Sequence, residues 1–406
     1  MSDFPAVESP VAKASAAVSA RSTLALIALM LLTICIGVGE FVVMGLLSQV
    51  AGAFGVSVAS AGWVVTGYAL GVAIGGPLIA LSVTRVERRR LLLILGMTFL
   101  LGTALCGWAP TYSVLLLGRV VASAAHGAFV GAAVVAATRL VRPERAGTAV
   151  AVVIGGFTVA TVIGVPLGTW AGQALGWRAV FWLIAGFSLL GWLLLAVLLQ
   201  PDHQQEAPDL RRELRTLARP TVAAALTTTA LGFGGMFAVF TYVEPLLTGV
   251  TGFAPSSVPA LLLLFGLGAL VGTVLGGRLA DRAVQSTLLW FLGVLSLALV
   301  VLPVVAEHSI GTGCLLFLVG AASFGSAPGL QLQVVQRCVN APFLSSTLNV
   351  SAFNAGNAIG AFSGGLLVAG SGSPRYTAWI GVGMTGAAWL IVAGSTRRTS
   401  AHPPTP

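Results

Sequence analysis

Long apolar runs separated by short polar connections dominate the chain. Most runs are about twenty residues long, the length at which an α-helix crosses a ~30 Å hydrocarbon core. Strands of a membrane barrel would instead alternate apolar and polar positions over about ten residues. The pattern therefore predicts an all-α membrane protein with twelve transmembrane helices, at residues 23–50, 60–82, 91–109, 113–137, 147–172, 177–199, 221–247, 257–279, 287–305, 310–332, 345–369 and 375–395.

The longest polar connection, residues 201–220, divides these helices six and six. Leu210, Leu214 and Leu217 recur in it at helical spacing, which predicts a short amphipathic helix on the membrane surface. No small-residue cleavage site follows the first apolar run, so we expect it to be retained as a helix. The expected organisation is a tail at 1–22, a six-helix bundle at 23–200, the linker at 201–220, a second six-helix bundle at 221–395 and a tail at 396–406.

The second half of the chain repeats the first at an offset of 196 or 197 residues. A constant offset through several helices is hard to obtain by chance, so it indicates a duplicated six-helix unit. Carriers built in this way bind substrate near the middle of the membrane, between the halves. The matching positions are Gly71, Gly75, Ile163, Gly164, Gly168, Arg178, Trp182 and Gly186 in the first half and Gly268, Gly272, Ile359, Gly360, Gly364, Arg375, Trp379 and Gly383 in the second.

Composition and charge agree with a membrane protein and add an orientation. Hydrophobic residues make up 57% of the chain and charged residues only 8%, whereas a soluble domain carries about a quarter. With the N-terminus inside, 18 of the 21 basic residues fall in inner connections and tails. The positive-inside rule therefore predicts a multi-pass protein of the inner (plasma) membrane with both termini cytoplasmic. Because these arginines are scattered over many short segments, nucleic acid is not an expected partner.

Very few charged residues lie within the apolar runs. A charged side chain at the membrane centre costs at least ~2.5–3.5 kcal/mol, so each requires an explanation. Glu40 lies in the first predicted span, Arg119 in the fourth, and Glu244 near the outer end of the seventh. Counted from the outer ends of their spans, Glu40 and Arg119 lie at a similar depth. At the duplicated offset the second half has only Met236 and Leu315 or Leu316.

These residues predict a proton-coupling site confined to the first half. Burial and a nearby guanidinium act in opposite directions on the protonation of a carboxylate. A glutamate whose arginine contact changes with conformation would therefore bind and release a proton, so we expect Glu40 to be the protonation site and Arg119 its partner. The alternative is a static buried ion pair that holds two helices together. His126 follows Arg119 by seven residues on the same helix face and is either a proton relay or a neutral packing residue.

Candidate substrate contacts are aromatic, sulfur-containing or amide side chains near the predicted centre. Adaptable residues of this kind suit varied apolar ligands, although aromatic stripes in apolar helices are more often packing. The candidates are Phe41, Met44, Tyr68, Phe237, Phe240, Tyr242, Glu244, Asn354 and Asn357.

Several other functions are disfavoured by the sequence. No catalytic constellation and no phosphate-binding Gly-rich motif is present, so neither an enzyme nor an ATP-driven pump is expected. The four cysteines are isolated, and no metal or other cofactor is predicted. A proton-independent uniporter, a nutrient importer on the same fold, and a non-transporting sensor or structural membrane protein are the alternatives.

Five motifs occur in order on the predicted helices. The chain thereby resembles the major facilitator superfamily, and within it the twelve-span drug:proton antiporters. The motifs are Gly39–Leu47, similar to the first-span acidic motif of arabinose-efflux-like and actinomycete chloramphenicol-resistance exporters; Leu117–Arg119; Gly164–Thr169, similar to the antiporter motif; Tyr242–Pro245; and Gly276–Arg282, similar to a gating loop.

The resemblance implies the major facilitator fold, with two pseudo-symmetric six-helix halves, and export of small apolar drugs by exchange for protons. It implies phenicols as leading substrates, and we expect a monomer. In the antiporter motif it implicates Gly164, Pro166 and Gly168, and in the gating loops Arg85, Arg88, Arg89, Arg278, Asp281 and Arg282. The first-half gating loop lacks the usual aspartate, and Glu87 stands nearby. A sugar or metabolite carrier, proton-independent or proton-symporting, is the alternative.

Overall fold

The computed structural model describes residues 10–82, 86–201, 219–338 and 342–400, and every regular element in these ranges is a helix. The predicted linker helix and Arg85 lie outside the described residues. The helices are α1 (Pro10–Phe41), η1 (Val42–Gly45), α2 (Leu47–Phe54), α3 (Val58–Ala61), α4 (Trp63–Ser82), α5 (Arg88–Trp108), α6 (Tyr112–Arg139), η2 (Pro143–Arg145), α7 (Ala146–Val159), η3 (Ala160–Gly164), α8 (Val165–Leu175), α9 (Trp177–Leu198), α11 (Pro220–Phe240), α12 (Val243–Gly249), η4 (Pro255–Ser257), α13 (Val258–Ala280), α14 (Val284–Val305), α15 (Ser309–Arg337), α16 (Pro342–Ser371), η5 (Pro374–Tyr376) and α17 (Thr377–Ser400).

Within the described residues, 11 helical stretches are long and apolar enough to cross a membrane. They coincide with eleven of the twelve predicted spans. The remaining predicted span, 345–369, lies in α16, which is a 30-residue helix but is not among those 11. Buried amides such as Asn349, Asn354 and Asn357 lower the hydropathy of α16.

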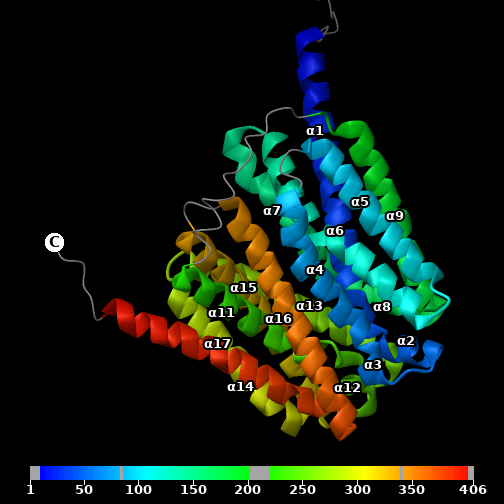
Figure 1. Cartoon of the computed structure of the whole chain (residues 1–406), viewed down its shortest axis with the longest axis vertical. Helices are drawn as coiled ribbons and strands as arrows, with labels where there is room; N and C mark the ends of the chain where they lie inside the picture. Colours follow the sequence, from blue (N-terminus) through cyan, green and yellow to red (C-terminus); the bar gives the residue numbers. More distant parts are fainter. Residues whose placement is uncertain (1–9, 83–85, 202–218, 339–341, 401–406) are drawn as a thin grey trace, which may run out of the picture.

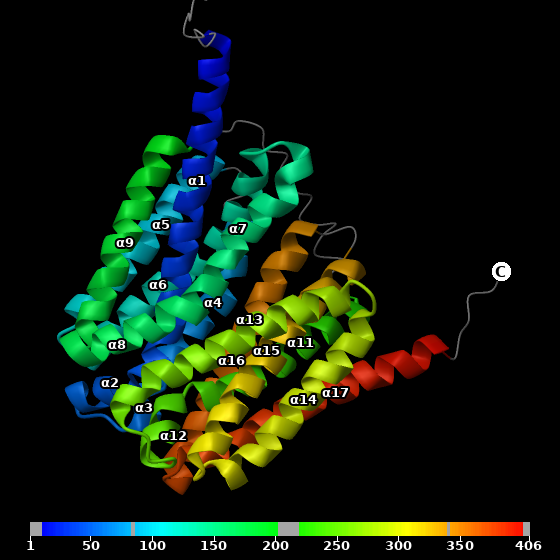
Figure 2. The same cartoon turned by 180° about the vertical axis from the view of Figure 1, so that it is seen from behind.

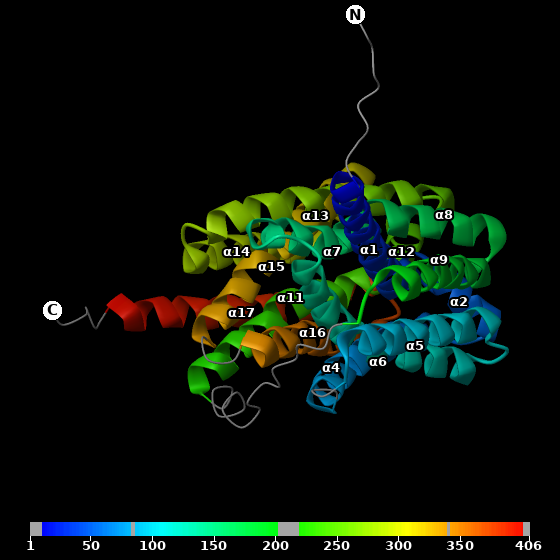
Figure 3. The same ribbon diagram turned by 90° about the horizontal axis from the view of Figure 1, so that it is seen from above.

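The helices form two bundles, α1–α9 and α11–α17 (Figures 1 and 2). The bundles converge where α2, α3 and α12 lie, which we call the α12 end, and diverge toward the side on which α1 begins and α17 ends. Seen from above, the second bundle lies on the left and the first on the right (Figure 3). The bundles meet along α4 and α16 and along α13 with η3 and α8.

Close helix contacts repeat between the two bundles at the offset found in the sequence. A methyl group added to Gly75 would lie 2.9 Å from the Cα atom of Ala124, and one added to Gly272 would lie 2.8 Å from that of Ala321. Both glycines therefore let two backbones approach to a distance that any side chain would prevent. Since 75 and 272, like 124 and 321, differ by 197, the duplication includes the packing of α4 on α6 and of α13 on α15.

Side-chain hydrogen bonds repeat in the same way. The indole Nε1 of Trp192 donates to the carbonyl of Leu93 at 2.8 Å, and that of Trp389 donates to the carbonyl of Leu289 at 3.0 Å. Each bond joins the sixth spanning helix of its bundle to the third. Because both partners are shifted by 196 or 197 residues, the two bundles are two copies of one six-helix fold, as the sequence predicts.

Candidate functional site

Glu40 lies at a change of helical geometry inside the first bundle. The α1 helix ends at Phe41, a 3-10 turn covers Val42–Gly45, and α2 begins at Leu47. Such a transition loosens the regular i+4 hydrogen bonding, so nearby carbonyls are available to other donors. In a membrane interior these donors must come from the protein itself.

Arg119 of α6 provides those donors. Its Nη1 donates to the carbonyl of Gly39 at 2.5 Å, and its Nη2 to the carbonyl of Glu40 at 3.4 Å. Its Nε donates to the carbonyl of Val64 on α4 at 3.1 Å, and its Cζ lies 4.0 Å from the centre of the Tyr68 ring. The guanidinium, 1% exposed, thus joins α1, α4 and α6 through backbone acceptors and a cation–π contact.

The carboxylate of Glu40 faces His126 instead of Arg119. Its Oε2 lies 3.9 Å from Nδ1 of His126, and no ion pair within 4.0 Å joins it to Arg119 in the described residues. Glu40 and Arg119 lie at a similar depth, as the sequence predicts, because the guanidinium of Arg119 binds the backbone carbonyl of Glu40. A static Glu40–Arg119 carboxylate pair is not what holds these helices together in this conformation.

His126 has two further contacts that fix its ring. Its Nδ1 lies 3.4 Å from the hydroxyl of Tyr68, and the ring stacks on Phe157 of α7 with centroids 5.5 Å apart. Tyr68, which the sequence suggested as a substrate contact, is therefore placed between Arg119 and His126. Glu40, Tyr68, Arg119 and His126 form one buried group, here called the ionisable cluster.

Aromatic side chains fill the interface between the bundles beside this cluster. Phe41 and Phe237 occupy equivalent positions, 196 residues apart, and their ring centroids lie 5.8 Å apart. Equivalent residues touch only near the pseudo-twofold axis, so these rings mark its position. Phe240 lies 6.4 Å from Phe41 and stacks on Phe265 at 4.1 Å. All four rings are buried against each other, so contact with a substrate would require them to separate.

The two candidate asparagines present unpaired acceptors. Asn354 donates its Nδ2 to the carbonyl of Val350 at 3.0 Å, which leaves its Oδ1 buried without a partner. Asn357, 2% exposed, has an Oδ1 without a partner as well. Both belong to α16, which packs against α4 of the first bundle. Buried polar atoms are rarely left unpaired, so these two oxygens are acceptors available to a ligand donor.

The predicted antiporter motif lies at a helix irregularity that packs against α1. A π-helical turn, Ala160–Gly164, precedes Pro166, which lacks the N–H that a continuous helix needs. A methyl group on Gly168 would lie 2.8 Å from Val42, and one on Gly164 would meet the side chain of Val38. The motif therefore fits α7–α8 tightly against the segment that carries Glu40.

The gating-loop residues lie away from this site. Arg278, Asp281 and Arg282 are exposed at the end of α13, on the diverging side. Arg89 donates its Nη2 to the carbonyl of Ala196 at 2.7 Å, within the first bundle. Arg88 is half-buried at the start of α5. The described residues thus show the positions of these side chains, but Arg85 is outside them.

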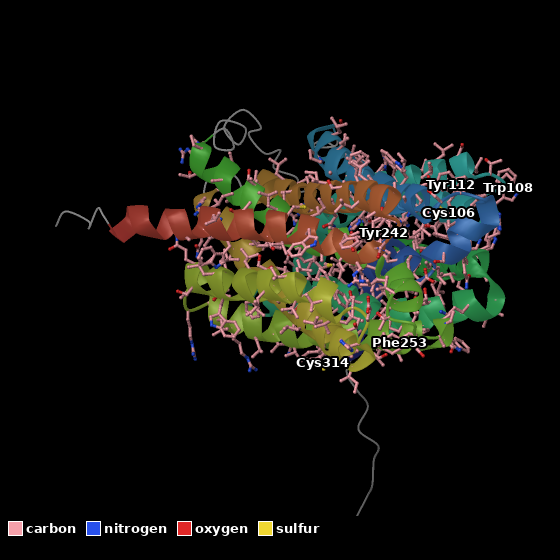
Figure 4. The ribbon with its side chains drawn as sticks, turned by 90° about the horizontal axis from the view of Figure 1, so that it is seen from below. Cys106, Trp108, Tyr112, Tyr242, Phe253 and Cys314 are labelled. Atoms are coloured by element: carbon pink, nitrogen blue, oxygen red, sulfur yellow. The ribbon has the colours of Figure 1, made fainter. Side chains whose placement is uncertain are left out.

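Three remaining candidates lie toward the α12 end. The hydroxyl of Tyr242 donates to the carbonyl of Ala361 at 3.0 Å, and in Figure 4 its label lies where the two bundles meet. Met44 is fully buried in η1. Glu244 of α12 accepts hydrogen bonds from Ser48 of α2. They are separate from the ionisable cluster and lie at a bundle contact.

Two residues of these sites are absent from the sequence predictions. Phe157 has no polar signal that distinguishes it from the other phenylalanines. Ser48 is 196 residues from Glu244, so the internal repeat could have identified it as the position equivalent to that carboxylate.

Two duplicated helical bundles that enclose a few buried polar groups define a secondary membrane carrier. The sequence model of the Major Facilitator Superfamily matches residues 29–346, and the chain belongs to that superfamily.

Comparison with known proteins agrees with this assignment. The chain is 39% identical over 363 residues to the inner membrane transport protein YdhP of Escherichia coli K12, which covers 89% of this chain and 93% of the relative. It is 32% identical over 337 residues to a chloramphenicol resistance protein of Streptomyces lividans, and this match covers 82% of this chain and 86% of that relative. A crystal structure of a bacterial homologue of the human lysosomal transporter Spinster, inward-facing and occupied, superposes with a TM-score of 0.71 at 18% identity, covering 94% of this chain and 98% of that one.

Proposed function

We propose that this carrier exports small, largely apolar molecules in exchange for protons. The observation that carries the proposal is the ionisable cluster: a buried carboxylate that faces a histidine, while the nearby guanidinium binds backbone carbonyls. A carboxylate without a fixed counter-ion in this position is free to change its protonation during a cycle. Arg119 needs only to exchange a carbonyl for the carboxylate of Glu40 to favour release of the proton.

The arrangement of the bundles supplies the alternating access that such an exchange requires. The two copies of the six-helix unit touch at the α12 end and diverge at the other. With both termini in the cytoplasm, as the basic residues suggest, the diverging side faces the cell interior. We propose that the carrier loads substrate from the cytoplasm in this conformation, as a monomer and with protons as its only coupling ion.

The proposed substrate is apolar with one or two hydrogen-bond donors. The aromatic cluster around Phe41 and Phe237 would provide the apolar contact. The unpaired Oδ1 atoms of Asn354 and Asn357 would accept from a hydroxyl or amide of the ligand. Phenicols have both properties, and a relative named for chloramphenicol resistance supports them as the first compounds to test.

The test compares Glu40→Gln with Glu144→Gln, a control at an exposed carboxylate in η2. The purified proteins are reconstituted into liposomes that contain a pH-sensitive dye, and chloramphenicol-driven proton movement is recorded. We expect Glu40→Gln to lower it about tenfold or more, because an amide does not titrate, with Glu144→Gln unchanged. Substrate binding, measured by tryptophan quenching, should persist in both. Undiminished proton movement in Glu40→Gln would rule out Glu40 as the coupling residue.

A sugar or metabolite carrier is the second candidate, and the two asparagines favour it because hydroxyl-rich ligands offer many donors. Uptake and efflux of labelled sugars and of chloramphenicol, each with and without an uncoupler, separate the two. Efflux of a sugar that ignores the uncoupler would establish the second candidate and exclude the first.

A further inference from the structure

A buried hydrogen-bonded contact joins the two bundles at the α12 end. The Oε2 atom of Glu244 accepts from the hydroxyl of Ser48 at 2.6 Å and from its backbone N–H at 3.0 Å. Glu244 is 8% exposed and belongs to the second bundle, whereas Ser48 belongs to the first.

The contact completes the start of a helix. Ser48 is the second residue of α2, and the residue before that helix, Leu46, provides no side-chain cap. The first backbone N–H groups of a helix have no partner within it and favour a negative charge. Glu244 supplies the acceptor for the backbone N–H of Ser48, so α2 is capped by the opposite bundle.

The position of this contact on the symmetry axis determines what it does. Ser48 and Glu244 are equivalent residues, 196 apart, like Phe41 and Phe237. The two pairs are separated by seven residues in each half. If the bundles rock about the aromatic pair, the Ser48–Glu244 pair must separate for the α12 end to open.

We propose that Glu244 is a positioning residue that holds the α12 end closed by capping α2, and that this bond breaks and re-forms in every transport cycle. This assignment replaces its expected role as a substrate contact. It rests on the duplicated bundles and not on the proposed proton coupling or substrate. When the bond breaks, the first N–H groups of α2 and the carboxylate need water as their new hydrogen-bond partner. Water reaches them only when the α12 end is open.

Other contacts between the bundles also hold the α12 end closed, and they limit how far the loss of Glu244 can raise the open fraction. Gln173 donates to the carbonyl of Pro255 at 2.7 Å across the exposed rim, and Trp63 packs against Phe362 with centroids 5.3 Å apart. Loss of Glu244 should therefore increase the open fraction without opening every molecule. Because two hydrogen bonds of ordinary net strength are lost, we expect the open-to-closed ratio to rise about tenfold in Glu244→Ala. In Ser48→Ala, which keeps the backbone N–H, we expect about threefold.

The experiment measures distances between spin labels at Ala53 and Ser256, exposed residues of the first and second bundle at this end. Cys314, which is exposed, is first replaced by serine, and the other cysteines are buried. The full-length protein is studied in lipid nanodiscs without substrate. Glu244→Ala and Ser48→Ala should both enlarge the long-distance population, and Glu244→Gln, which keeps an acceptor oxygen, should have a smaller effect.

A matched control is Glu307→Gln. Glu307 forms an exposed ion pair of 2.7 Å with Arg375 at the same end, but both residues belong to the second bundle. Its loss should leave the distances unchanged. The proposal is overturned if Ser48→Ala and Glu244→Gln, which conserve size and fold, have the wild-type distribution, or if Glu307→Gln shifts it equally. Proton coupling is tested separately through Glu40, so failure of the Glu244 proposal would not contradict the proposed proton coupling, and the reverse also holds.

Discussion

Replacement of Arg119 by lysine would separate the charge of this side chain from its hydrogen-bond pattern. The guanidinium reaches three carbonyls, at Gly39, Glu40 and Val64, from one rigid plane. A lysine ammonium keeps the positive charge but is a single point that does not reproduce the planar fork. We therefore expect Arg119→Lys to weaken the junction of α1, α4 and α6 even though the net charge is unchanged.

The expected loss follows from the bonds. A hydrogen bond to a charged group contributes a net ~1.5–3 kcal/mol, and lysine should retain one of the three. The Nη2 bond is long, 3.4 Å, and counts for less than the others. The cation–π contact with Tyr68, 4.0 Å from Cζ to the ring centre, is weakened as well. The free energy of unfolding should therefore fall by about 2–4 kcal/mol.

Equilibrium unfolding of the purified protein in mixed detergent micelles measures this loss. Arg178→Lys is the control, because Arg178 is half-buried, donates once, to Ala109 at 2.8 Å, and lies 4.3 Å over Trp177. At that half-buried position, where lysine can still donate the one hydrogen bond, we expect a loss of about 1 kcal/mol or less. If Arg119→Lys were as stable as the wild type, or if both variants lost the same amount, the carbonyl bonds would not be the main role of Arg119.

Two further predictions concern packing and proton movement. Gly272→Ala should lower the midpoint of unfolding, at a cost of ~1–3 kcal/mol, because the new methyl group would lie 2.8 Å from the Cα atom of Ala321. In the control Gly277→Ala the new methyl group meets nothing within 4 Å, so the midpoint should not change. Equal midpoints in the two variants would contradict the close approach. His126→Gln should slow substrate-driven proton movement in liposomes while substrate binding is kept, since glutamine preserves a polar side chain but does not titrate; an unchanged rate would make His126 a packing residue beside Glu40.

The helices and their duplication were predictable because each depends on local or periodic features. A run of apolar residues long enough to span the membrane has few alternatives to a helix. The offset also predicted matching packing, as at Gly75 and Gly272. The span at 345–369 shows the limit, since α16 places amides such as Asn357 in the interior and its hydropathy alone is a weak signal.

The partners of the buried charges were less predictable. The free-energy cost of a charge in the membrane identified Glu40 and Arg119 as exceptional residues, and their depths agree. Their opposite charges, however, suggested a direct carboxylate–guanidinium pair. The structure has carbonyl partners instead, because α1 changes to a 3-10 turn at Val42. Gly164 and Gly168, more than a hundred positions away, pack closely against Val38 and Val42 at this turn. Sequence spacing contains no record of such a contact.

The symmetric scaffold and the asymmetric chemistry have different roles. Packing contacts and indole hydrogen bonds repeat in both bundles, so the two bundles share one helical scaffold. The ionisable cluster does not repeat: Met236 stands at the position equivalent to Glu40 and is fully buried among apolar side chains. A rocking motion available to both bundles has no direction of its own. If protons drive this carrier, as we propose, the direction must come from the first bundle, and the second, with Asn354 and Asn357, is the proposed place for the substrate.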